Sequence, residues 1–192
     1  MKRLLLILIL ILSFQSGSKA DDIRDFKVEG MSVGDELSDF MSINEIKENT
    51  LPYFKDKRKY YVVAIIDNLK KYDQVEIYLK SNDTSYEIKT ILAGVIIENF
   101  NKCIKQKKEI VKILDEMFKN VEKVSAVKKH DADPTGNSKH YVDQYNLNYP
   151  DHIRVECTKF SEQIKNDGMA QNSLNIVVMS KEINDWIASG YR

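Results

Sequence analysis

NKCIKQKKEIVKILDEMFKN, residues 101–120, is the stretch that decides the fold, because its apolar residues recur at helical spacing. One face collects Cys103, Ile104, Ile110, Val111, Leu114, Met117 and Phe118. The opposite side carries Lys105, Lys108, Lys112, Asp115 and Lys119. The spacing predicts one long amphipathic helix, with Cys103 on the face that packs against the rest of the protein.

Runs with strand character lie on both sides of this helix. Before it we expect strands at residues 60–66 (YYVVAII), 74–80 (QVEIYLK) and 86–97, with Gly94 marking a bulge or a close packing point. After it we expect strands at residues 121–129, 139–148, 152–160 and 174–179. The connections in the first group are too short for parallel crossovers, so these strands should form an antiparallel meander.

Short helices are expected near both ends. Capping pairs at Ser32/Asp35 and Ser42/Glu45 predict two helices within residues 22–49, and Ser180 begins a closing helix with Ile183, Trp186 and Ile187. Residues 164–173 look like a polar loop. The predicted fold class is α+β: an antiparallel sheet packed on one long amphipathic helix, with short helices near both ends.

Residues 1–20 have the layout of a secretory signal peptide. Lys2 and Arg3 precede the aliphatic run 4–12, and Ser18-Lys19-Ala20 resembles a cleavage site. The run is too short to span a bilayer, which takes about 20 apolar residues. We therefore expect cleavage after Ala20 and a periplasmic or secreted product without stable membrane insertion.

Bulk composition limits the possibilities further. Cleavage would leave 172 residues as a single α+β domain, with two lobes at 21–120 and 121–192 as an alternative. The chain has 29 basic and 29 acidic residues, and loss of Lys2, Arg3 and Lys19 leaves 26 basic residues and a net charge of −3. This balance does not favour nucleic acid as a partner.

The two cysteines, Cys103 and Cys157, both lie in the expected mature chain. In an exported protein an even pair indicates a disulfide, and the alternative is two buried thiols. Cys157 shares strand parity with Ile153 and Val155, so its side chain should face inward, toward the helix.

Residues 129–140 (KHDADPTGNSKH) are the sharpest local feature. Asp131, Asp133 and Thr135, followed by Gly136, match the opening of a calcium-binding loop, although Val142 stands where the closing Glu is expected. The alternative is a polar loop with local side-chain turns. We interpret His130, Asp131, Asp133, Thr135 and His140 together as a possible binding loop.

Catalytic patterns are weaker. His130, Asp131, Asp133 and His140 could surround a transition metal, as in a metal-dependent hydrolase, but their spacing matches no zinc signature. The sequence contains no glycine-rich phosphate loop. We therefore expect no enzymatic activity and no cofactor, with bound calcium as the alternative.

Three tyrosines share one strand parity: Tyr141, Tyr145 and Tyr149. If exposed, they would form an aromatic surface for a peptide, a glycan or a partner protein; if buried, they are ordinary sheet residues.

Three segments carry a resemblance. Residues 23–49 (IRDFKVEGMSVGDELSDFMSINEIKEN), the helix around Cys103, and KHDADPTGNSKHY at 129–141 resemble short exported proteins of unknown function from marine bacteria with AT-rich genomes. The resemblance implies export and a shared fold, and it brings no activity or cofactor. Gly30-Met31 before a helical pair and strands is also similar to small lipoproteins that assist outer-membrane barrel assembly.

The sequence thus predicts an exported, non-catalytic binding or interaction module whose partner is an envelope protein or a small ligand. A calcium-stabilised structural module is the first alternative, and a metal-dependent hydrolase is the second.

Overall fold

The computed structural model describes residues 22–52, 59–131, 133–147, 151–168 and 170–190. The expected signal peptide, residues 1–20, and Tyr149 lie outside these ranges. The described chain has an α+β fold in which an antiparallel sheet of seven strands dominates.

The strands follow the expected periodicities. They are β1 (Tyr60–Ile65), β2 (Gln74–Lys80), β3 (Ile88–Ile96), β4 (Glu122–Lys129), β5 (Lys139–Leu147), β6 (Asp151–Lys159) and β7 (Ser173–Met179). Their order across the sheet is β1-β2-β3-β7-β6-β5-β4, and every neighbouring pair is antiparallel. The first meander is therefore confirmed, and strands from both halves of the chain share one sheet.

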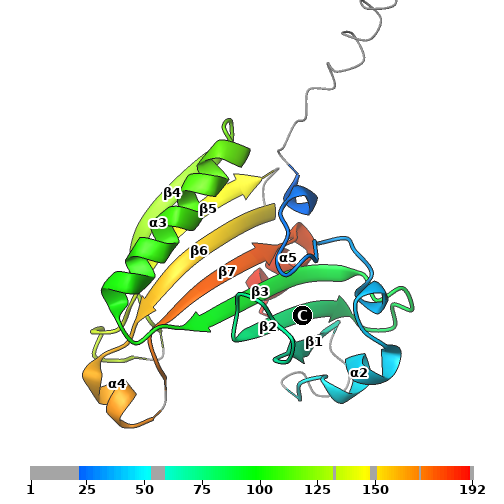
Figure 1. Ribbon diagram of the computed structural model, residues 1–192, viewed down its shortest axis with the longest axis horizontal. Helices are drawn as coiled ribbons and strands as arrows, with labels where there is room; N and C mark the ends of the chain where they lie inside the picture. The colour runs from blue at the N-terminus through cyan, green and yellow to red at the C-terminus, as the bar shows by residue number, and fades with distance from the viewer. Residues whose placement is uncertain (1–21, 53–58, 132, 148–150, 169, 191–192) are drawn as a thin grey trace, which may run out of the picture.

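Helix α3 (Phe100–Met117) is the connection between the two halves. It carries the chain from β3, in the middle of the sheet, to β4 at the far edge, after which β5, β6 and β7 step back to pair with β3 (Figure 1). The helix packs against β6 and β7. A disulfide joins Cys103 of the helix to Cys157 of β6, with 6.0 Å between their Cα atoms.

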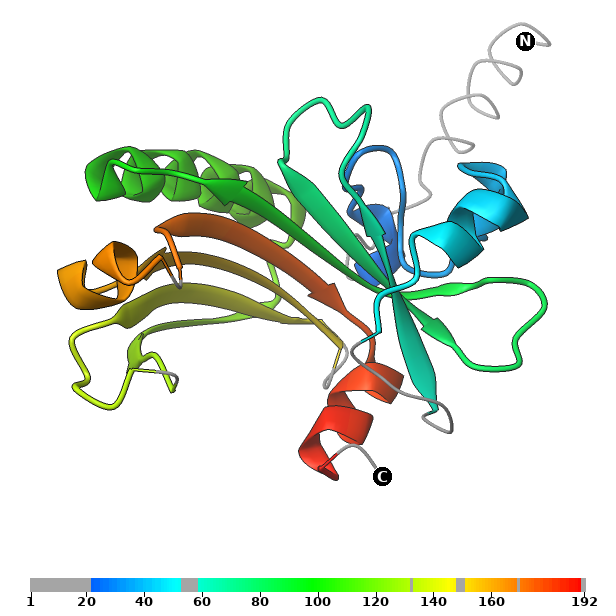
Figure 2. The same cartoon turned by 90° about the horizontal axis from the view of Figure 1, so that it is seen from below.

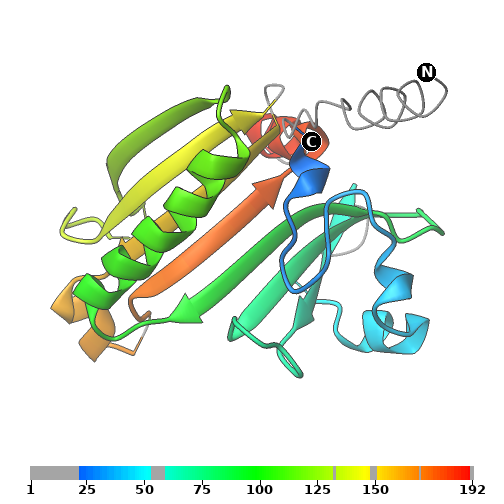
Figure 3. The ribbon, with the colours of Figure 1, turned by 45° about the horizontal axis from the view of Figure 1, so that its top comes forward.

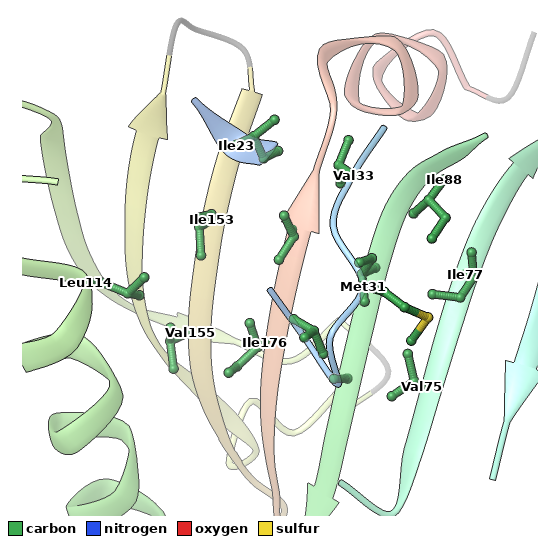
Figure 4. Close-up of a cluster of buried hydrophobic side chains, with 14 of the residues drawn as sticks. Ile23, Met31, Val33, Val75, Ile77, Ile88, Leu114, Ile153, Val155 and Ile176 are labelled. Carbon is green, nitrogen blue, oxygen red and sulfur yellow. The ribbon is translucent and has the colours of Figure 1, made fainter. Parts of the chain in front are cut away.

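One hydrophobic core fills the face of the sheet that carries α3. Residues 23–33 lie across this face beside the helix, and their side chains meet those of the central strands (Figures 3 and 4). Figure 4 labels Ile23, Met31, Val33, Val75, Ile77, Ile88, Leu114, Ile153, Val155 and Ile176 in this layer. Alternation along each strand directs the intervening residues to the opposite face.

Helix α5 (Lys181–Ala188) lies on that opposite face, as Figure 2 shows. Ile183 and Trp186 of α5 pack with Tyr60 in a second, smaller apolar cluster. This confirms the closing helix. The close packing point expected at Gly94 is also confirmed: a Cβ atom at this position of β3 would lie 2.9 Å from Asn175 Oδ1 of β7.

The N-terminal helices are only partly as expected. The Ser42/Glu45 capping box is present and begins α2 (Ile43–Glu48). The helix expected after Ser32 is wrong: the region contains the 3₁₀ turns η1 (Ile23–Asp25) and η2 (Leu37–Asp39). Gly34, at φ 93°, gives this segment a conformation incompatible with a helix.

The polar loop expected at residues 164–173 is also partly wrong. Helix α4 (Glu162–Asn166) forms there behind a Ser161 cap, with Ile164 buried. Five residues with one buried apolar side chain are too short to give a periodic signal. Across the residues that the structure describes, no helix is both long enough and apolar enough to cross a membrane.

Candidate functional site

A cavity of about 460 Å³ opens on the α3 face of the sheet, between the helix, the sheet and the N-terminal segment. Its floor is apolar and consists of Val95 of β3 with Leu174 and Ile176 of β7. Val95 is paired with Leu174 in the sheet register, so the floor depends on the contact between the middle strand and the last strand. This volume lies in the range of small-molecule sites, roughly 300–1,000 Å³.

Helix α3 supplies one wall of this cavity, which we call the α3 pocket. Ile110 and Ile113 point their side chains to it, one turn apart, with Gln106 and Glu109 beside them. Ile113 is 54 % exposed, an unusual position for a large aliphatic side chain on a helix that is otherwise amphipathic. The pocket explains this exposure, because Ile113 lies at its mouth.

The second wall comes from Phe26 and Lys27 of the N-terminal segment and from Lys71 and Tyr72 of the β1–β2 loop. Glu29 joins these two segments. Its carboxylate accepts hydrogen bonds from the backbone N–H groups of Lys70 (3.1 Å) and Lys71 (2.8 Å).

The same loop is fixed at its other end. Asp73 donates its backbone N–H to the Gly94 carbonyl (2.9 Å) and accepts the Ile96 N–H through its carboxylate (2.8 Å). The loop is therefore held at both ends by hydrogen bonds, three of them accepted by the Glu29 and Asp73 carboxylates, and the pocket is pre-formed rather than a gap beside a loose loop.

The polar groups at the pocket mouth are two cations and one anion. Lys27 and Lys71 are exposed, and neither takes part in an ion pair within the described part of the chain. Glu109 is the single carboxylate among the described lining residues. The mouth thus has an excess of positive charge.

Tyr72 places a phenol group in the wall. Burial, with a smaller contribution from Glu29, raises the pKa of Tyr72 to about 12. The hydroxyl therefore stays protonated at neutral pH and can donate a hydrogen bond to a ligand. The described lining residues include no serine, cysteine or histidine.

Asp133, one of the residues of the predicted binding loop, is the centre of that loop's own hydrogen bonds. Its Oδ1 accepts from the N–H (2.9 Å) and hydroxyl (2.6 Å) of Thr135, and its Oδ2 accepts from the N–H (2.8 Å) and hydroxyl (2.6 Å) of Ser138. These bonds, from Ser138 first and then Thr135, hold the pKa of Asp133 far below its usual range. The Asp133 carboxylate thus accepts four hydrogen bonds from its own loop. Such local side-chain turns are what the polar-loop alternative predicts.

Asp131, the other carboxylate of the expected calcium loop, is exposed on the same loop. Within the described ranges, no group of three or more His, Cys, Asp or Glu side chains is arranged to hold a metal ion. The calcium loop that the sequence pattern suggests therefore lacks a formed ligand set in the part of the chain that is described.

The two loop histidines do come together, on the opposite side of the sheet from the α3 pocket. The rings of His130 and His140 stack with centroids 4.6 Å apart, and Phe160 packs on His130 at 4.7 Å. His140 Nδ1 lies 2.9 Å from the Thr158 hydroxyl and 3.8 Å from Glu156.

Burial lowers the pKa of His140, against the attraction of the Glu156 carboxylate. Arg154 Nε lies 3.2 Å from the same carboxylate. Glu156 is thus the shared partner of a small polar cluster.

The two described tyrosines of the predicted aromatic surface, Tyr141 and Tyr145, differ in burial. Tyr145 is 1 % exposed under the helix, and its hydroxyl donates to Asp115 (2.6 Å) and lies 3.1 Å from the Val111 carbonyl oxygen. Tyr141 is half-buried and packs on Phe100 with ring centroids 4.9 Å apart. Tyr145 is therefore a buried sheet residue and no part of an exposed aromatic surface.

Sequence reasoning missed the α3 pocket. Its floor joins β3 to β7, which are almost eighty residues apart along the chain, and strand order is not encoded in local periodicity. The available signal was Ile113, an aliphatic residue outside the predicted apolar face of the helix. No protein-family model matches this chain, and comparisons with curated proteins and with solved structures find no match either.

Proposed function

We propose that this protein is an exported, non-catalytic binding protein that holds a small amphiphilic molecule in the α3 pocket. The observation that carries the proposal is a pre-formed cavity of about 460 Å³ with an apolar floor and a charged mouth. The ligand is an apolar chain or ring system that ends in an anionic group.

The apolar part of the ligand is suited to the floor and the helix wall. Val95, Leu174 and Ile176 lie below it, and Ile110 and Ile113 lie beside it. Each methylene group that a ligand removes from water there contributes about 0.8 kcal/mol to binding. A hydrocarbon segment therefore gains affinity without any specific hydrogen bond.

The anionic group is suited to the mouth. Lys27 and Lys71 outnumber Glu109, and the Tyr72 hydroxyl adds a neutral donor. An anion there forms charge-assisted hydrogen bonds that a neutral group of the same size does not form.

Export is the second part of the proposal. Residues 1–20 serve as the signal peptide, and the mature protein begins at Asp21 in the periplasm or outside the cell. The Cys103–Cys157 disulfide supports this location, because such bonds persist in oxidising compartments. N-terminal sequencing of protein recovered from the envelope should give Asp21-Asp22-Ile23, and an intact Met1 in the cytosol would refute export.

Calorimetric titration with decanoate and with decan-1-ol tests the binding site. Both probes should bind the purified protein, and decanoate should bind more tightly at low ionic strength. A protein in which Ile110 is replaced by Trp should bind neither probe, because the indole group fills the pocket. If the unmodified protein takes up neither probe, the proposed function is wrong.

A further inference from the structure

Strand β4 forms an edge of the sheet that no other described strand covers. Among the described strands it pairs with β5 alone, and it forms the outer margin in Figure 3. All of its residues except Ala126 are exposed, including Val124 (44 %) and Val127 (60 %). It has eight residues, no proline and no register shift against β5. Long, regular edges of this kind template pairing with another strand.

The other edge of the sheet is covered by the chain itself. Thr50 forms a bridge with Val63 of β1. The Leu51 N–H donates to the Val62 carbonyl (2.8 Å), and the Ala64 N–H donates to the Asn49 carbonyl (2.9 Å). The chain therefore covers part of the β1 edge, whereas no described segment pairs with the outward side of β4.

The hydrogen bonds at the end of β4 establish which backbone groups face outward. The His130 N–H donates to the Ser138 carbonyl (3.0 Å), one residue beyond the Lys129–Lys139 pair. Because hydrogen-bonded and non-bonded pairs alternate in antiparallel strands, the even-numbered residues of β4 bond to β5. The N–H and C=O groups of Lys123, Ser125 and Val127 point away from the sheet.

We propose that β4 pairs in antiparallel fashion with β4 of a second copy of this chain, about a two-fold axis at Ser125. Ser125 then faces Ser125 of the second copy, and Lys123 faces Val127, so that outward backbone groups meet outward backbone groups. Val124 faces Ala126, which covers two apolar side chains. Glu122 faces Lys128 on both sides of the axis.

Charge complementarity selects this register. It forms two symmetry-related Glu122–Lys128 pairs and places no like charges directly opposite each other. A shift by two residues in one direction puts Lys123 opposite Lys129, which is repulsive. A shift in the other direction puts Glu122 opposite Ala126 and loses both ion pairs.

The geometry has a consequence for the α3 pocket. A two-fold axis perpendicular to the sheet keeps each face of the sheet on the same side in both copies. The two α3 helices, and both pockets, therefore open on one side of the dimer. This dimer and the proposed ligand-binding function are independent of each other, and either can fail alone.

Sedimentation velocity of the protein purified from an exporting host tests the dimer. The interface is small, so we expect a reversible monomer–dimer equilibrium at concentrations up to about 0.5 mM. Val127→Pro removes an outward N–H without touching the β4–β5 ladder and should be monomeric. Val127→Thr keeps the N–H and should still dimerise. Circular dichroism checks that both variants fold.

Charge exchange tests the register. Glu122→Lys and Lys128→Glu each replace two attractive pairs by repulsive ones and should weaken the dimer about tenfold. The double variant carrying both changes should recover the original dimerisation. A protein that stays monomeric throughout the concentration range, or a double variant as weak as the single ones, would overturn the proposal.

Discussion

The disulfide between Cys103 and Cys157 joins the crossover helix α3 to strand β6. In the sheet, β6 lies two strands away from β3, the strand that leads into this helix. The bond closes a loop with a sequence separation of 54 residues. It therefore restricts the position of the one long helix relative to the sheet on which it lies. The α3 pocket depends on this position, since Ile110 and Ile113 form its helical wall.

Removal of this disulfide should cost about 4 kcal/mol of folding free energy, because the loop is no longer closed in the unfolded chain. Urea denaturation of the oxidised protein, with and without reductant, measures the difference. A Cys103→Ala/Cys157→Ala variant is the matched control and should not respond to reductant. Equal stability of the oxidised and reduced protein would contradict this expectation.

Asp133 should stabilise the loop at residues 130–138 in a pH-dependent way. The pKa of this carboxyl group is lower in the folded protein than its ordinary value of 3.8, owing to hydrogen bonds from Ser138 and Thr135. The ionised group therefore stabilises the fold above that value, and the stabilisation is lost as the pH falls through the acid range.

Denaturation at pH 7 and pH 3 should show that Asp133→Asn is destabilised at both values and less at pH 3 than at pH 7, because part of the stabilisation is lost once the pH falls below the ordinary pKa of the carboxyl group. Asp131→Asn is the control, since Asp131 is exposed on the same loop, and it should follow the unmodified protein at both values. A large melting shift of the unmodified protein with calcium would instead favour the calcium-stabilised module.

Tyr145→Phe should destabilise the protein by about 1–2 kcal/mol, because the buried hydroxyl donates to Asp115 and its loss leaves the helix without this contact. The hydrogen bond from Lys123, followed by that from Tyr145, lowers the pKa of Asp115.

Tyr141→Phe is the control for the Tyr145 variant. The Tyr141 hydroxyl makes no hydrogen bond within the described residues, so its removal should change the melting temperature little. If both variants melt at the same temperature, the hydroxyl of Tyr145 does not hold α3 to β5.

Charge changes at the pocket mouth should act with opposite signs on decanoate. Lys27→Gln and Lys71→Gln should each weaken its binding about two- to fivefold, and Glu109→Gln should strengthen it by a similar factor. Decan-1-ol should bind all three variants alike, which separates an electrostatic effect from damage to the wall. Titration at low and at high salt checks the result, because the effect on decanoate should shrink with screening.

Local sequence patterns were sufficient for most of the elements. The alternation in residues 74–80 predicted β2, and the helical spacing of Ile110, Leu114 and Met117 predicted α3. They failed where the signal was short or backbone-dependent: α4 has one buried residue, and the turn at Gly34 replaced an expected helix. The ion pair between Lys107 of α3 and Asp143 of β5 was also missed, because the sequence does not show that these two residues meet beneath the helix.

By itself the sequence determined the α+β class and the antiparallel meander before the long helix, and it indicated a disulfide between the two cysteines, because periodicity and composition are local quantities. Tertiary structure alone decided that β7 inserts beside β3, that β4 is left at an edge, and that Ile113 and Val95 line one pocket. These facts depend on which distant strands pair. Many strand orders satisfy the same alternation of polar and apolar residues, and only the packing of the whole chain distinguishes among them.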